Sequence, residues 1–203
     1  MISRTTAVAR LALTAAMTFA PLYAGNAMAD TGWMAGGNLG HSKLKNFRLT
    51  TTSFNDTATP FEVFAGYKFP APVAVTVGYL DLGSYHAEGP DFGGYVNDMK
   101  AEGIHVSGIG LVPLSPRFSG LVHAGVYFWS YKFHSVDDDD PDRRLSDSGK
   151  SLTYGSGFNV KMSESVSLHI IWQHFNKVGN RQTVEHENDY DLFVLGGTYL
   201  IGK

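Results

Sequence analysis

Three histidines, His105, His123 and His169, stand in apolar segments on the polar side of an alternating pattern. Histidine titrates near neutral pH and is a frequent metal ligand, so a metal centre or a proton-sensitive site is one interpretation. The other is a buried polar network that also includes Asn159. His123 and His169 are predicted to lie two strand spacings apart, about 10 Å, whereas a zinc–nitrogen bond measures about 2 Å. The spacing favours the polar network, and we expect no metal or other cofactor.

A serine follows the first of these histidines, and serine beside histidine is the core of many acyl-transfer sites. Ser107 stands two positions after His105. On a strand such residues share a face but lie about 6.6 Å apart, beyond hydrogen-bond distance. The chain is therefore not predicted to be an enzyme. It also has no cysteine, which excludes thiolate metal sites and disulfides.

An acidic run near the middle of the chain is the third group that could do chemistry. Carboxylate oxygens are the ligands that calcium prefers, but the run lacks the glycine and the final glutamate of an EF-hand loop. Runs of like charge usually stay solvated. A solvated loop and a cation-binding or surface-contact loop both remain open for Asp137, Asp138, Asp139, Asp140 and Asp142.

The N-terminus has the layout of a secretory signal. Arg4 and Arg10 precede an apolar run that ends in Ala27-Met28-Ala29, a small-residue cleavage pattern. We therefore expect residues 1–29 to be removed and residues 30–203 to form one domain. Loss of the two arginines would move the formal net charge from −3 to −5. No basic stripe remains, so nucleic-acid binding is not expected.

The segments that must position these groups read as strands, because apolar residues recur with a period of two. Their connections alternate in length. Residues 70–72, 115–118 and 162–165 are tight turns, whereas 44–59, 87–99, 134–149 and 178–189 are predicted to be long polar loops. This alternation is typical of an up-and-down barrel of the outer-membrane kind. The eight predicted strands lie near residues 32–43, 60–69, 73–86, 100–114, 119–133, 150–161, 166–177 and 190–201.

Residues 61–83 show the orientation of these strands. One face is apolar and aromatic, and the other carries glycine, alanine, threonine and a few charges. A small closed barrel filled by its own side chains suits such a face, with the apolar face toward lipid; a soluble β-sandwich or lipocalin-like barrel is the alternative. The predicted interior network is Glu62, Lys68, Thr76, His105, His123, Asn159, His169 and Gln173. The predicted lipid-facing residues and aromatic girdles are Phe61, Tyr67, Phe69, Tyr79, Phe128, Trp172, Phe193 and Tyr199.

Several segments carry a family resemblance: residues 65–69 (AGYKF), 78–85 (GYLDLGSY), 100–129 and the last strand, 192–201. Together they resemble the transmembrane domain of OmpA-like outer-membrane proteins, in the same order. The resemblance implies an all-β, eight-stranded antiparallel up-and-down transmembrane β-barrel in a Gram-negative outer membrane. Many such proteins also carry a peptidoglycan-binding domain, which is not expected here because the predicted last strand ends the sequence. Its implied partners are membrane lipid, lipopolysaccharide, the barrel assembly machinery and periplasmic chaperones. The family's interior ion-pairing positions fall on Thr76, Ile109, Asn159 and His169, so its charged gate is predicted to be missing.

These observations predict a structural or surface-interaction role, adhesion-like, with the lumen plugged by small and polar side chains and the long loops free to meet an extracellular ligand. Two alternatives remain. A narrow, low-conductance channel is compatible with the small interior residues. A lipid A-modifying enzyme, a deacylase or an acyltransferase, is compatible with the barrel but matches no motif in the sequence.

Overall fold

The computed structural model describes residues 31–45, 53–55, 57–89, 95–136, 143–180 and 186–202. The expected signal segment and the acidic run at 137–142 lie outside these ranges. Within them, no helix is long and apolar enough to cross a membrane.

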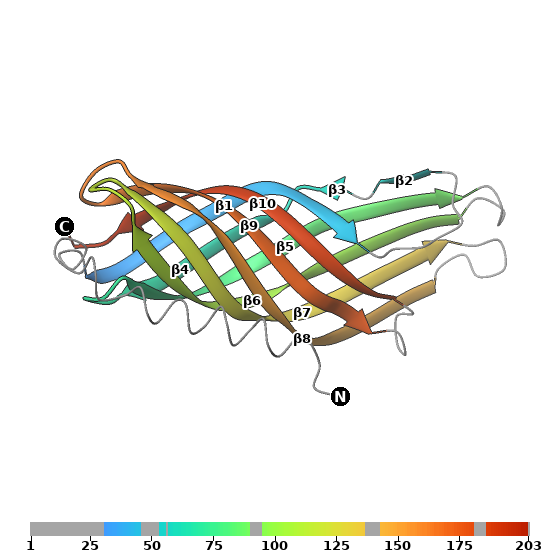
Figure 1. Cartoon of the computed structure of the whole chain (residues 1–203). Coiled ribbons are helices and arrows are strands. Elements are labelled where there is room, and N and C mark those ends of the chain that lie inside the picture. The colour runs from blue at the N-terminus through green and yellow to red at the C-terminus, as the bar shows by residue number, and fades with distance from the viewer. Residues whose placement is uncertain are drawn as a thin grey trace, which may run out of the picture.

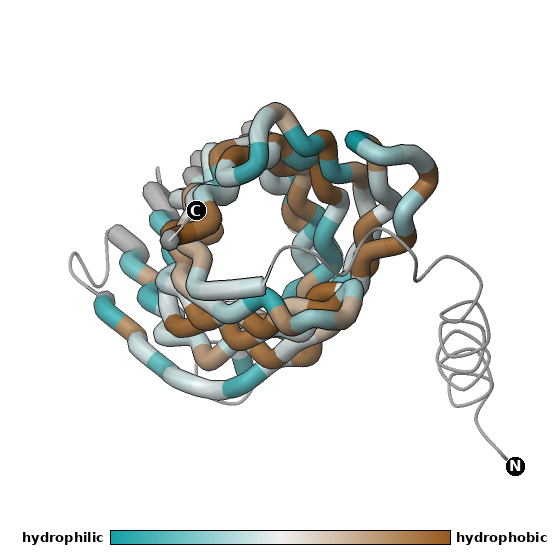
Figure 2. The backbone as a smooth tube through the Cα atoms, turned by 90° about the vertical axis from the view of Figure 1, so that its left-hand side faces the viewer, coloured by the Kyte–Doolittle hydropathy of each residue, from teal (hydrophilic) through white to brown (hydrophobic). Residues whose placement is uncertain are grey.

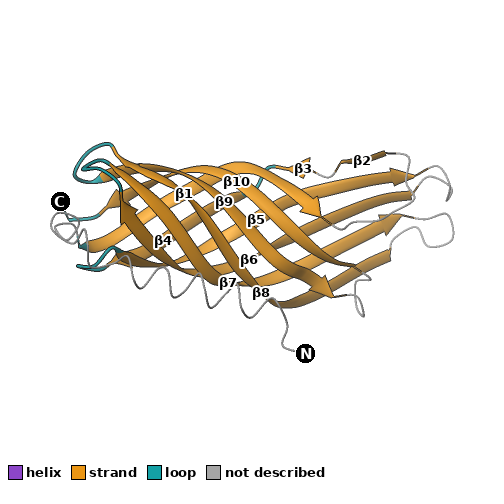
Figure 3. Ribbon diagram, viewed as in Figure 1, coloured by secondary structure: helices purple, strands orange, loops and turns teal. Residues whose placement is uncertain are grey.

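Eight long antiparallel strands form a closed barrel, as the sequence predicted (Figures 1 and 3). Each long strand pairs with the next along the chain, and the first pairs with the last from Met34↔Leu200 to Lys45↔Asp189. Closure leaves no open edge along the part of the wall where all eight strands are paired, which is what a lipid environment requires. The strands are β1 (Gly32–Lys45), β4 (Phe61–Lys68), β5 (Val73–Gly89), β6 (Tyr95–Pro113), β7 (Phe118–Val136), β8 (Arg143–Lys161), β9 (Val166–Asn180) and β10 (His186–Leu200).

One end of the barrel is trimmed to tight turns, again as predicted. Phe69 donates its backbone N–H to the Val73 carbonyl at 3.0 Å, and Leu114 donates to Phe118 at 2.9 Å. The third turn closes in the same way, from Met162 to Val166 at 2.9 Å. In outer-membrane barrels the short connections face the periplasm, so we call this the periplasmic end.

At the other end the strands run further than predicted, and the loop assignments 87–99 and 134–149 were wrong in extent. β5 and β6 pair out to Gly89↔Tyr95, and β7 and β8 pair out to Ser135↔Arg143. The predicted loop 44–59 also holds two short strands, β2 (Ser53–Asn55) and β3 (Thr57–Ala58). Polar residues continue the hydrogen-bonded ladder here because pairing does not depend on an apolar face. Residues 84–89, 95–101, 130–136 and 143–151 thus form an extension of one side of the barrel, the projecting wall (Figure 1).

The outward face of the barrel carries the lipid-facing band. Apolar side chains with large exposed fractions, such as Val122 (46 %) and Ile170 (54 %), alternate with inward residues on every long strand. Figure 2, viewed along the barrel, shows apolar and polar positions alternating around the wall. The aromatic residues named from the sequence are all outward: Phe61, Phe69, Tyr79, Phe128, Phe193 and Tyr199 are exposed, and Tyr67 and Trp172 are partly exposed.

The outward aromatic rings gather near the two limits of the band. Near the periplasmic turns, Tyr67 contacts both Trp33 and Phe69, with ring centroids 5.4 and 5.2 Å apart. Towards the other limit, Tyr79 lies 6.1 Å from Phe61. Transmembrane barrels carry aromatic girdles at both interfaces, and the assignment of these rings to two girdles stays a prediction.

Candidate functional site: the barrel interior

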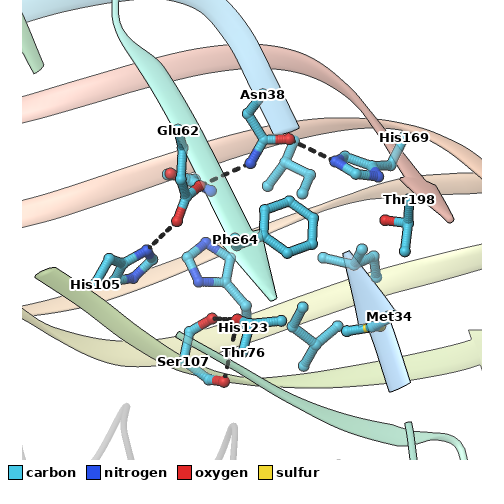
Figure 4. Close-up of a pocket in the computed structure, with 14 residues that line it drawn as sticks. Met34, Asn38, Glu62, Phe64, Thr76, His105, Ser107, His123, His169 and Thr198 are labelled. Atoms are coloured by element: carbon cyan, nitrogen blue, oxygen red, sulfur yellow. Dashed lines mark hydrogen bonds and ion pairs between the residues drawn. The ribbon is translucent and has the colours of Figure 1, made fainter. Parts of the chain in front are cut away.

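A chain of side-chain hydrogen bonds crosses the barrel interior in its inner, periplasmic half (Figure 4). Its centre is Glu62 on β4, which is 6 % exposed. Asn38 donates its Nδ2 group to Glu62 Oε2 at 2.7 Å, and His105 Nδ1 lies 2.8 Å from Glu62 Oε1. At the far side, His169 Nε2 lies 2.6 Å from Asn38 Oδ1. The carboxylate is therefore bonded by side chains from β1 and β6, and Asn38 extends the chain of bonds to β9.

The contacts of His105 define the direction of its hydrogen bonds. The Glu62 carboxylate can only accept, so His105 donates from Nδ1. Its other nitrogen, Nε2, lies 3.0 Å from the Thr153 hydroxyl. Neutral His105 would accept a hydrogen bond from Thr153, so one imidazole links a carboxylate on β4 to a hydroxyl on β8. Both nitrogens are occupied by structural partners.

Glycines opposite the histidines make room for the rings. His123 lies across from Gly155, and His169 lies across from Gly196. A Cβ atom at either glycine would collide with the imidazole Nε2 of its neighbour. The glycine-rich interior face seen in the sequence therefore leaves space for large polar side chains against the barrel wall.

A small cavity of about 40 Å³ with both polar and apolar lining residues lies within this cluster. His123 is 6 % exposed, and neither of its ring nitrogens has a hydrogen-bond partner in the described part of the chain. The same holds for Oε1 of the buried Gln173. A water needs about 10–15 Å³ of such space and two to four polar partners, so the cavity is large enough for water. Its polar lining comes from Asn38, Glu62, Thr76, His105, Ser107, His123, His169, Gln173 and Thr198.

The outer half of the interior is apolar and aromatic, which the sequence reasoning missed. Tyr127, Phe175 and Tyr190 are almost completely buried, and the Tyr127 and Phe175 rings meet edge to face at 5.4 Å. Tyr127 donates its hydroxyl to the Leu80 carbonyl at 3.2 Å. The signal was present as aromatic residues at inward positions of the predicted strands, but the sequence analysis gave these residues no role. The layer consists of Leu44, Leu80, Leu82, Tyr85, Met99, Ala101, Tyr127, Trp129, Tyr131, Phe175, Val178, Tyr190 and Leu192.

The remaining predicted interior residues differ in how deeply they are buried. Thr76 is buried, and its hydroxyl lies 2.8 Å from that of Ser107. Lys68 and Asn159 are only half-buried and do not line the cavity. Asn159 sits opposite His169 in the β8–β9 ladder. Asn38, which bridges Glu62 to His169, was not predicted; its alternation on β1 was the available signal.

The geometry also bears on the serine–histidine pair and the metal site that were considered from the sequence. Ser107 is bonded to Thr76, and His105 is held by Glu62 and Thr153, so the two do not form a nucleophile–base pair. Among the described residues, no three His, Asp or Glu side chains come together to hold a metal ion. The resemblance placed uncharged residues at the family's charged positions, but the interior does contain a carboxylate, contributed by Glu62 from another position.

Charged side chains mark the outer limit of the lipid-facing band. Glu102 accepts from Lys100 and Lys132, both at 2.8 Å, and from the Tyr79 hydroxyl at 3.0 Å. These bonds, chiefly the one from Lys100, lower the pKa of Glu102 to about 2. Lys100 also pairs with Asp81 at 3.0 Å, and its two carboxylate partners raise its pKa. This cluster of charges on β5, β6 and β7 lies between the lipid-facing band and the projecting wall.

Comparison with known families agrees with this architecture. Residues 28–203 match the model of the OmpA-like transmembrane domain. The chain belongs to this family. It is an outer-membrane protein of the Gram-negative type, and the localisation predicted from the sequence is confirmed.

Individual relatives are distant from this OmpA-like chain. Outer membrane protein A of Salmonella typhi is 23 % identical over 179 residues, which is 86 % of this chain and 49 % of the relative. The chain thus spans about half the length of that relative.

The solved structures show a likeness of fold. Neisserial surface protein A has a TM-score of 0.58 at 13 % identity, with 84 % of this chain and 97 % of that one covered. Ail, the attachment invasion locus protein of Yersinia pestis, has a TM-score of 0.52 at 15 % identity, with 83 % and 96 % covered.

Proposed function

We propose that this chain is a non-conducting barrel that acts at the cell surface through its projecting wall. The observation that supports the proposal is the two-layered interior: a hydrogen-bonded layer around Glu62 and, beyond it, an aromatic layer around Tyr127. Two layers of opposite polarity would interrupt an aqueous path for ions. A role in transport is therefore disfavoured, and the feature left for interaction is the wall outside the membrane.

The alternatives receive less support. A narrow channel would need the aromatic layer to part, yet its rings are packed against one another and against backbone carbonyls. A lipid A-modifying enzyme would need a serine–histidine pair that lipid can reach, and His105 is both buried and fully engaged. On export, we expect the leader at 1–29 to be removed and insertion to depend on periplasmic chaperones and the barrel assembly machinery.

The first test is conductance in planar lipid bilayers. We expect the wild-type protein to give no discrete current steps. The double variant Tyr127→Ala/Phe175→Ala, which removes both rings of the aromatic contact, should give steps if it retains heat-modifiable migration on gels. Steps from the wild-type protein would contradict the closed lumen.

The second test addresses the surface role. Cells would express either the full chain or a variant with β7 and β8 shortened by joining Ser130 to Ser148 through a two-residue Asn-Gly turn. We expect only the full chain to raise adhesion to surfaces coated with extracellular-matrix proteins, while both chains reach the membrane. Equal adhesion would remove the β7–β8 part of the wall from the proposed function.

A further inference from the structure

Two buried side chains at the interior cavity have polar atoms that no protein group satisfies. His123 on β7 and Gln173 on β9 are 6 % and 4 % exposed, and both line the cavity (Figure 4 labels His123). Both ring nitrogens of His123 and Oε1 of Gln173 have no hydrogen-bond partner in the described part of the chain. Buried polar groups are almost always hydrogen-bonded, so these atoms point to a bound group.

The two side chains stand in one row across the sheet. His123 pairs with Gly155, and Gly155 pairs with Gln173. The backbones of β7 and β9 are therefore two strand spacings apart here, about 10 Å. Gly155 adds no side chain to the row, and His123 Nε2 lies over it, where a Cβ atom would collide with the ring. His123 thus extends toward the strand of Gln173 without bonding to it, which leaves room for a bridging group.

Apolar side chains border this polar layer on both sides. Toward the periplasmic turns, Met34 and Ile109 line the cavity and pack in a cluster with Ala74 and Leu200. On the outer side, the ring of His105 lies against Phe175 of the aromatic layer, with centroids 5.6 Å apart. A group held in the cavity is therefore enclosed by the barrel.

The donors and acceptors of the cavity select the ligand. A neutral imidazole has one nitrogen that donates and one that accepts, whereas an amide oxygen only accepts. The ligand must therefore accept a hydrogen bond from His123 and donate one to Gln173. An ammonium or metal ion cannot accept a hydrogen bond. An anion cannot donate one, and it would face the carboxylate of Glu62, which lines the same cavity. Water does both.

We propose that the cavity is a permanent binding site for a cluster of ordered water molecules, which joins His123 and Gln173 to the network around Glu62. Its volume of about 40 Å³ has room for about three waters at 10–15 Å³ each. Each water needs two to four polar partners, and the lining hydroxyls that add to the histidine, amide and carboxylate groups belong to Thr76, Ser107 and Thr198. The cluster brings β7 into a network that otherwise excludes it. The inference rests on the barrel interior and not on the proposed surface role.

The test is NMR of the protein in lipid nanodiscs, with methyl groups as reporters and water as the probe. The methyl groups of Ile109, Leu121 and Ile171 line the cavity. They should show NOE and ROE cross-peaks to water of opposite sign, which only a long-lived water gives. Leu82 and Leu192, which are fully buried in the aromatic layer, should show no such cross-peaks.

Two variants identify the groups that hold the waters. His123→Phe keeps an aromatic ring and removes both nitrogens, and Gln173→Met keeps the chain length and removes the amide oxygen. Each should lose most of the cavity cross-peaks while retaining heat-modifiable migration. Thr153→Val is the matched control, because it removes a hydroxyl that bonds to His105 but does not line the cavity. Its cross-peaks should persist.

Four results would overturn the proposal. The first is the lack of water cross-peaks at the cavity methyl groups of the wild-type protein. The second is cross-peaks that are unchanged in both variants, which would mean relay through the threonine and serine hydroxyls. The third is a set of xenon-induced shifts at the same methyl groups, which would indicate a dry cavity. The fourth is a saturable shift on addition of ammonium or potassium chloride, which would indicate a cation site.

Failure of the proposed function would look different. Equal adhesion by the full and shortened chains would leave the cavity cross-peaks unchanged. An open lumen would add water cross-peaks at Leu82 and Leu192. The outcomes of the two proposals can therefore be told apart.

Discussion

Replacing Glu62 tests the central claim about the interior. Glu62→Ala removes the acceptor of two short bonds, 2.7 Å to Asn38 and 2.8 Å to His105, and leaves both donors buried. Removing one partner of a buried charged pair costs about 3–5 kcal/mol. Glu62→Gln keeps the shape and one acceptor oxygen, so the loss should be smaller, about 1–3 kcal/mol, the cost of one weakened buried bond.

The matched control lies at the outer limit of the lipid-facing band. Glu102→Gln also removes a carboxylate with close basic partners, but Lys132 is 61 % exposed there. Exposed pairs contribute about 0.2–1 kcal/mol. We therefore expect destabilisation in the order Glu62→Ala, Glu62→Gln, Glu102→Gln.

Equilibrium unfolding by urea in lipid vesicles, followed by tryptophan fluorescence and by heat-modifiable gel migration, would measure these differences. A loss below about 1 kcal/mol for Glu62→Ala, no larger than that of Glu102→Gln, would refute the reasoning, because it would mean that water or another group readily replaces the carboxylate.

Two further substitutions test the space left by the interior glycines and the lipid-facing side of the barrel. Gly155→Ala places a Cβ against the neighbouring imidazole and a backbone carbonyl, so it should destabilise the barrel by about 1–3 kcal/mol. Gly108→Ala is the control, because a Cβ there meets one atom at 3.9 Å. It should cost under about 0.5 kcal/mol in the same unfolding assay. Val122→Arg, midway along the lipid-facing part of β7, should lower the free energy of unfolding in vesicles by about 2–4 kcal/mol. Ser148→Arg on the projecting wall should be nearly neutral. Equal losses for the two variants would place Val122 outside the lipid.

The barrel and its orientation could be predicted because they depend on short-range patterns. Alternation in segments such as 61–69 and 73–79 assigns a face to each residue, since successive side chains point to opposite sides of a strand. The three tight turns gave the order of the strands. The polar ends of β5–β8 were misjudged because hydrogen bonding between strands, not polarity, decides whether such residues form loops.

The interior site was only partly predictable. Alternation placed Glu62, His105, His123 and His169 on the inward side, but it carries no information on which inward residues meet across the barrel. Asn38 became a bridge because closure brings β1 against β10 and so near His169 on β9. The strand-separation argument covered only His123 and His169, and it did not consider His105 and His123, whose ring centroids lie 6.1 Å apart on neighbouring strands.

By itself, the sequence determined the strand type, the lipid-facing side and the lack of any thiol chemistry, because each depends on residue type and a period of two. The tertiary structure decided the two-layered interior, the partners of Glu62 and the point at which the β8–β9 ladder ends. These depend on the stagger between strands and on a local change near Lys177, which has a positive φ and beyond which β9 pairs only with β10. Such long-range geometry appears only when the sheet closes.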